Sequence, residues 1–142
     1  AIAWHAYFAA IAVALLFGFR PPKRLAGLLL VPPLLSVSVL AWLAGNPFNG
    51  IAFALLAVPL LFLACRLGCE PVRIAPAIFL FPGLALFAFG WAYPHFLGSA
   101  SLLPYLYKAP TGLIPCPTLA IVIGLALVLD GLGSRALCLA LG

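Results

Sequence analysis

The chain carries little charge. Only 6% of its 142 residues are charged, and Glu70 and Asp130 are the only acidic ones. A soluble domain has about 25% charged residues, so this sequence cannot cover a globular surface with polar groups. Two carboxylates are also too few for general acid–base catalysis. The scarcity of charge therefore excludes a soluble globular domain and argues against an enzyme that acts alone.

The sequence also lacks the short motifs that mark common sites. It has no Walker loop, nucleophile elbow or His-Glu-x-x-His segment. Its four cysteines do not form the framework of a small disulfide-rich domain. The net charge of +5 comes from lysines and arginines scattered between apolar runs. We therefore interpret the positive charge as a sign of membrane topology and expect no nucleic-acid partner.

Apolar residues dominate instead. They make up 67% of the chain, mean hydropathy is +1.31, and several runs approach the ~20 residues that cross a bilayer as a helix. These runs are too long for barrel strands of about 9–11 residues. The sequence predicts an all-α, polytopic transmembrane helical bundle, one integral membrane domain over residues 1–142. Five helices are expected at about residues 2–19, 25–44, 48–67, 74–96 and 117–132.

The two ends of the sequence suggest that the protein is longer. The sequence starts without Met and stops inside an apolar stretch that begins at Arg135. We expect the start of a truncated sixth helix there. We also expect the chain to be a fragment, or to be processed at its N-terminus.

Lysine and arginine fall mostly in alternate loops. Loops 20–24 and 66–73, together with Arg135, carry all of them except Lys108. If the helices alternate in direction, these loops share one side, and the positive-inside rule makes that side cytoplasmic. The first residue then lies on the outer side. The tryptophans and tyrosines agree, because all of them would lie at or near the outer interface, where amphipathic rings are favoured.

Prolines interrupt three of the expected helices near their middle. These residues are Pro32, Pro33, Pro59 and Pro82. Each proline removes an amide donor and frees the carbonyl one turn earlier. In a transporter such carbonyls can line a midplane site for an ion or substrate. We favour ordinary kinks, with the freed oxygens bonded to neighbours such as Ser36 or Ser38, because no intramembrane charge accompanies them. Asp130 and Arg135 are expected to pair at the inner interface.

Histidine and cysteine are the only candidate ligands for a metal or haem. The predicted topology places His5, His95 and Cys116 in the outer leaflet. Imidazole and thiolate suit zinc, copper or haem iron. The alternative is that these histidines are interfacial and bonded to lipid or to a backbone carbonyl, which is the commoner case. The spacing carries no metal-binding motif, so no cofactor is required by the sequence.

Cys116 stands between two prolines in the stretch APTGLIPCPTLAIVIG, residues 109–124. Pro117 fits the first helical position, where a missing amide has no cost. Cys116 then falls at the helix cap, with Thr118 one residue inside. We predict that this stretch starts a helix on the outer face, where Cys116 can react with an external thiol reagent.

Three stretches resemble a family of bacterial integral membrane proteins of unknown function, the DUF6064 type. They are GNPFNGIAFALLAVPLLFLA, FAFGWAYPHFLG and APTGLIPCPTLAIVIGLAL. The resemblance covers about residues 45–135, and the last stretch is the most specific. It implies a membrane architecture, longer chains with at least one more helix, and no established activity. Members that carry Asp at the position of Cys116 imply a capping role for this residue.

Three functions remain open. We favour a non-catalytic accessory or structural subunit of a larger membrane protein complex, in the bacterial inner membrane or an intracytoplasmic membrane. Small residues at Ala120 and Gly124 suit helix packing within the bundle or against other membrane subunits, and that complex could itself be an enzyme. The first alternative is a redox, metal-binding or haem protein that uses the outer-face histidines and cysteine. The second is a carrier or channel for a small neutral solute.

Overall fold

A computed structural model describes residues 1–93 and 103–141 of the chain. The described residues are all-helical, without a β-strand, which confirms the all-α class. Their elements are α1 Ile2–Leu16, α2 Lys23–Leu43, α3 Pro47–Arg66, α4 Ala77–Ala92, α5 Tyr105–Lys108, α6 Pro115–Val128, the 3₁₀ turn η2 Asp130–Gly133 and α7 Arg135–Leu141. Within the described residues, α2 and α3 are the two helices long and apolar enough to cross a membrane, a test that buried core helices of soluble proteins also pass.

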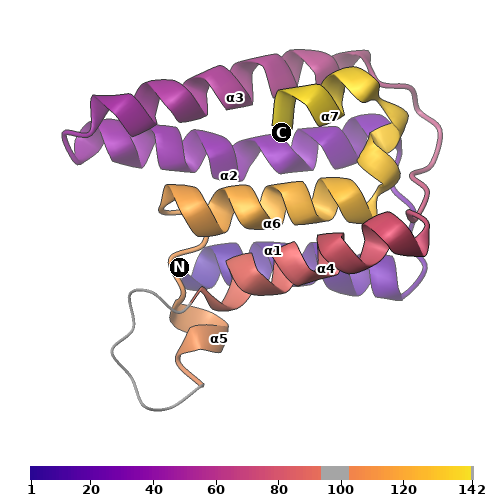
Figure 1. The fold of residues 1–142 in the computed structure, drawn as a ribbon, viewed down its shortest axis with the longest axis horizontal. Helices are drawn as coiled ribbons and strands as arrows, with labels where there is room; N and C mark the ends of the chain where they lie inside the picture. The colour runs from indigo at the N-terminus through magenta and orange to yellow at the C-terminus, as the bar shows by residue number, and fades with distance from the viewer. Residues whose placement is uncertain (94–102, 142) are drawn as a thin grey trace.

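The helices lie side by side in an elongated bundle (Figure 1). α2 packs closely along α3, and α4 packs closely along α6. α6 also contacts α2 and thereby joins the two pairs, while α7 folds back against α3. α6 is the most buried of these helices and supplies Ile121, Val122 and Leu125 to the core. The segment that opens on the Pro-Cys-Pro sequence is therefore central to the packing.

Several helix boundaries differ from the predicted ones. α1 ends at Leu16, three residues early, because the chain turns at Gly18, whose φ is +85°. α4 begins at Ala77, after Pro76, and ends at Ala92; residues 94–96 of the predicted helix lie outside the described residues. The predicted loop before the fifth helix contains the short helix α5.

The end of α6 is set by a left-handed turn. Asp130, Gly131, Leu132 and Gly133 all have φ between 54° and 66°. This conformation costs a non-glycine residue about 1–2 kcal/mol, so only the two glycines adopt it readily. The turn reverses the chain, and Ser134 caps α7 by accepting a hydrogen bond from the amide of Leu137 at 3.2 Å. The predicted helix over 117–132 therefore stops at Val128.

Glycines let α4 and α6 approach closely. A Cβ atom on Gly124 would lie 2.7 Å from the carbonyl oxygen of Gly83, and one on Gly90 would lie 2.5 Å from that of Pro117. Real Cβ atoms do not come this close, so each position requires glycine. The close approach expected at Gly124 thus occurs inside the bundle, against α4.

The loops that carry most of the cations meet at one end of the bundle (Figure 1). The amide of Val72 donates to the carbonyl of Pro21 at 2.9 Å, and Lys23 forms an ion pair with Glu70 at 3.0 Å. Among the described residues this is the one ion pair. The pair predicted between Asp130 and Arg135 is wrong, because the left-handed turn between these residues redirects the chain.

Candidate functional site

The Pro-Cys-Pro segment is flanked by two of the four buried polar residues among the described ones, Thr111 and Thr118. The amides of Leu113 and Ile114 both donate to the carbonyl of Pro110, at 3.0 and 3.2 Å, which makes a tight turn. Gly112 adopts φ +76° in this turn, and the indole of Trp4 lies directly against it. A Cβ atom at this position would overlap the Trp4 ring. The turn therefore docks onto the start of α1.

Two threonines and a serine tie this turn to three helices. The Thr118 hydroxyl is fully buried; it accepts from the Gly112 amide at 2.8 Å and donates to the Ile114 carbonyl at 2.6 Å. Thr111 donates to the carbonyl of Gly90 in α4. Ser36 in α2 donates to the carbonyl of Gly112 at 2.7 Å. The polar groups of the segment are thus used to hold α2, α4 and α6 together, and sequence reasoning predicted this role for neither threonine.

α6 begins two residues earlier than the sequence suggested. Its cap is Ile114, with extended φ −126° and ψ 158°, and Pro115 takes the first helical position. The prediction of Cys116 as the cap and Pro117 as the first helical residue is therefore wrong. The cause is that the first amides of a helix have no intrahelical partner, so Pro115 and Pro117 both fit the first turn. The turn at Pro110 selects Pro115.

Cys116 is exposed on the first turn of α6. It lies beside Tyr93, which follows the last residue of α4. Desolvation, together with the neighbouring thiol, raises the pKa of Tyr93. The cysteine thus joins the start of α6 to the end of α4.

His5 links the start of α1 to the end of α4. The residue is 5% exposed, and its Nδ1 and Nε2 atoms lie 3.1 Å from the carbonyl oxygens of Ala1 and Trp91. The ring also meets the Trp91 indole edge-on, with centroids 5.0 Å apart. Both partners are acceptors, so a neutral imidazole donates to one of them at a time and a doubly protonated one to both. This matches the predicted alternative of a histidine bonded to backbone.

The described residues do not show a set of metal or haem ligands. The described residues contain no group of three or more His, Cys, Asp or Glu side chains that could hold a metal ion. His95 lies outside the described residues. A metal at His5 would have to displace the carbonyl of Ala1 or Trp91 from the ring. As it is arranged, His5 does not fit a metal or haem site.

The four prolines singled out in the sequence all lie within helices, at Pro32 and Pro33 in α2, Pro59 in α3 and Pro82 in α4. Of these, only Pro33 is buried. The carbonyl that Pro33 leaves free, that of Leu29, accepts a hydrogen bond of 2.6 Å from the hydroxyl of Tyr7 in α1.

The serines expected to bond these freed oxygens have other partners. Ser36 donates to Gly112, and Ser38 donates to the carbonyl of Gly50 in α3 at 2.7 Å. That expectation is therefore wrong for both serines. Sequence reasoning gave Tyr7 only an interfacial place and so missed its bond to α2.

Two apolar grooves lie beside α1. One, of about 270 Å³, runs between α1, α2 and α6 and includes Tyr7 and Leu29 in its lining. The other, of about 530 Å³, runs between α1, α4 and α6 and has Arg20 in its lining. They exist because α1 approaches its neighbours less closely than α2 approaches α3 or α4 approaches α6.

Comparison of the chain with protein-family models, curated proteins and solved structures finds no match. The resemblance to the DUF6064 type stays a prediction. The function must therefore be argued from the residues and their arrangement.

Proposed function

We propose that the chain is a multi-pass integral membrane protein that packs in the bilayer as an accessory subunit of a larger membrane complex, without catalytic chemistry of its own. The observation that carries this proposal is the apolar exterior. Large hydrophobic side chains are exposed on α1, α2, α3 and α4; for example, Leu16 at the end of α1 is 85% exposed, and Phe17 just after it is 87% exposed. Soluble monomers rarely expose contiguous apolar patches of more than a few hundred Å². A lipid environment removes this cost.

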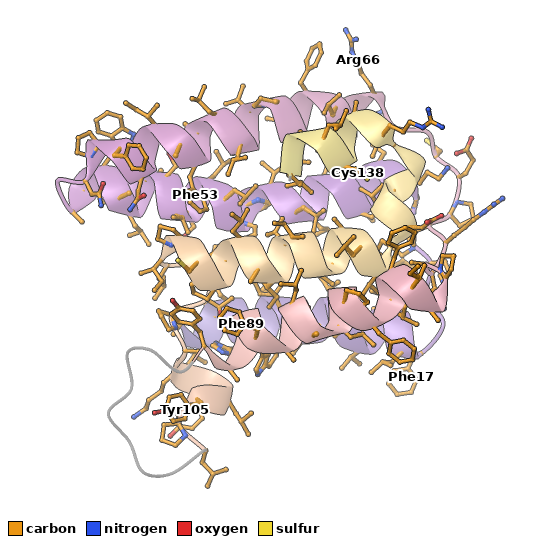
Figure 2. All side chains as sticks on the ribbon, viewed as in Figure 1. Phe17, Phe53, Arg66, Phe89, Tyr105 and Cys138 are labelled. Atoms are coloured by element: carbon orange, nitrogen blue, oxygen red, sulfur yellow. The ribbon has the colours of Figure 1, made fainter. Side chains whose placement is uncertain are left out.

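The distribution of charge supports the same conclusion. Arg20, Lys23, Arg24, Arg66, Arg73 and Arg135 all lie in or beside the connections at one end of the bundle. Figure 2 shows Arg66 projecting away from the ribbon at this end. The positive-inside rule makes this end cytoplasmic and the first residue external. α2 and α3, with 21 and 20 residues, are each about 30 Å long, which matches the hydrocarbon thickness.

The buried polar groups favour a structural role. Within the described residues, no buried side-chain nitrogen or oxygen lacks a hydrogen-bond partner. The hydroxyls of Ser36, Ser38, Thr111 and Thr118 each donate to a backbone carbonyl. In a membrane interior an unsatisfied polar group costs several kcal/mol, so these bonds stabilise the bundle. Groups already committed in this way are poor candidates for binding a substrate.

The same arrangement gives less support to the two alternatives. A redox or metal site needs a free His5 ring, and both ring nitrogens face carbonyls. A carrier route through the proline positions needs these residues on an internal path, and Pro32, Pro59 and Pro82 are exposed on the outside of their helices. We therefore keep the subunit proposal as the favoured one.

Two measurements test the proposal. Alkaline carbonate should leave the protein in the membrane pellet, because its exterior is apolar. After extraction in a mild detergent, the protein should run at a mass above that of the 14.9 kDa chain, together with a stoichiometric partner subunit. Release by carbonate would overturn the membrane assignment. A lone monomer in mild detergent would overturn the subunit assignment.

A further inference from the structure

We propose that the groove between α1, α4 and α6 binds one acyl chain of an anionic phospholipid, with the lipid phosphate on Arg20. The inference rests on the membrane location proposed above. It goes further because it assigns a lipid class and a headgroup ligand to one place in the fold.

The groove has the shape and chemistry of a chain-binding site. Its volume is about 530 Å³, and Arg20 is the only charged residue among those that line it. α1 contributes Ala12 and Leu16, and α4 contributes Leu80 and Leu84. Because the Ala12 side chain is small and α1 packs loosely on its neighbours, side chains do not fill the space between α1 and α4. An acyl chain is the apolar group that a bilayer supplies to such a space.

Arg20 is held at the end of the groove where the cations gather. Its Nη1 atom donates to the carbonyl of Leu15 at 2.8 Å and to that of Phe19 at 3.2 Å. These bonds use carbonyls at and beyond the C-terminus of α1, which attract a cation. They also fix the position of the side chain, and the residue stays exposed. A guanidinium presents paired N–H groups that match phosphate oxygens.

The surroundings favour an anionic headgroup over a zwitterionic one. Lys23 is paired with Glu70, but Arg24 and Arg73 are exposed in the same set of connections. The acidic residues at this end are Glu70 and Asp130, against six lysines and arginines. This excess of positive charge attracts anionic lipid. The groove that includes Tyr7 has no cation in its lining, so it lacks this preference.

The test compares lipids that differ only in headgroup. The protein is purified in a non-ionic detergent and mixed with phosphatidylglycerol or phosphatidylcholine of identical chains, and retained lipid is counted by native mass spectrometry. We expect a preference for phosphatidylglycerol of about fivefold, the effect of one cation near an anionic lipid. Equal retention of the two lipids by the unmodified protein would overturn the proposal, whatever the variants do.

Three variants locate the site. Arg20→Gln should bring the two lipids close to equal retention. Arg66→Gln, the matched control, should keep the preference, because Arg66 lies on α3 over the Phe62 ring and away from α1 and α4 (Figure 2). Leu84→Trp should reduce retention with Arg20 intact, because the indole fills the groove. A preference that survives Arg20→Gln, or is lost in Arg66→Gln, would contradict the site.

Two further measurements, competition by inorganic phosphate and extraction with carbonate, distinguish a phospholipid site from a site for free phosphate and from a wrong membrane assignment. Inorganic phosphate in millimolar excess should not displace phosphatidylglycerol, because the acyl chain contributes to binding; displacement would show a site for free phosphate instead. A protein that resists carbonate but shows no headgroup preference would refute the lipid site alone. A protein released by carbonate would refute the membrane location itself.

Discussion

The hydroxyl of Tyr7 in α1 donates a 2.6 Å hydrogen bond to the carbonyl oxygen of Leu29 in α2. This oxygen is the one that Pro33, four residues later, cannot bond because it has no amide hydrogen. The hydrogen bond that Pro33 in α2 cannot donate is thus replaced by one from Tyr7 in α1. The bond fixes α1 against α2, although the two helices do not pack closely along their length.

Tyr7→Phe should destabilise the protein because it leaves the Leu29 carbonyl without its donor. The expected loss is about 1–3 kcal/mol in the free energy of unfolding, measured by denaturation in detergent. Tyr107→Phe, at an exposed position, should have little effect. If Pro33→Ala is added to Tyr7→Phe, the restored amide should recover part of the loss, since the two changes share one oxygen. Unchanged stability in Tyr7→Phe would refute the compensation.

Thr118→Val should also destabilise the protein. The valine fills the same space but leaves the Gly112 amide and the Ile114 carbonyl without their shared partner. A loss of about 1–3 kcal/mol is expected, again from denaturation in detergent. Thr118→Ser keeps the hydroxyl and should recover most of the loss. Equal stability of the serine and valine variants would mean that the hydroxyl does not hold the turn.

Gly90→Ala tests the packing of α4 on α6. The added methyl would lie 2.5 Å from the carbonyl oxygen of Pro117, so the two helices must separate. Overpacking of this kind costs about 1–3 kcal/mol, seen as a lower melting temperature in detergent. Gly68→Ala is the matched control, because its nearest neighbour is the flexible Glu70 side chain. If Gly90→Ala melted at the same temperature as the unmodified protein, this account of the interface would be wrong.

His5→Ala tests the role of the imidazole. Loss of its contacts with the Ala1 and Trp91 carbonyls should lower stability by about 1–3 kcal/mol, as the start of α1 detaches from α4. The metal content and the visible absorbance of the purified protein should be the same before and after the change. A metal or haem that is bound to the unmodified protein and lost in His5→Ala would favour the redox alternative.

The overall class could be predicted from the sequence, and several details could not. Long apolar runs predict helices, and all the lysines and arginines except Lys108 lie in or beside the connections at one end of the bundle. The prolines at 32, 33, 59 and 82 lie within helices, as their surrounding sequence indicates. These features depend on local composition, which the sequence states directly.

The missed features depend on contacts between distant segments. A helix that is apolar all round has no polar face to show which side is buried, so the partner of the Leu29 carbonyl could not be identified. Two prolines fit the first turn of α6, and the turn at Pro110 decided between them. The left-handed conformation at Leu132 opposes the local preference of leucine, so no propensity rule would have placed it.

The most direct test of the membrane account is the accessibility of two cysteines in intact and permeabilised cells. Cys116 and Cys69 are both exposed, and the proposed topology places them on opposite sides of the membrane. Variants that keep one of these cysteines are treated with a membrane-impermeant maleimide. The account predicts labelling of Cys116 in intact cells and labelling of Cys69 only after permeabilisation. Labelling of Cys69 in intact cells, or of Cys116 only after permeabilisation, would contradict it.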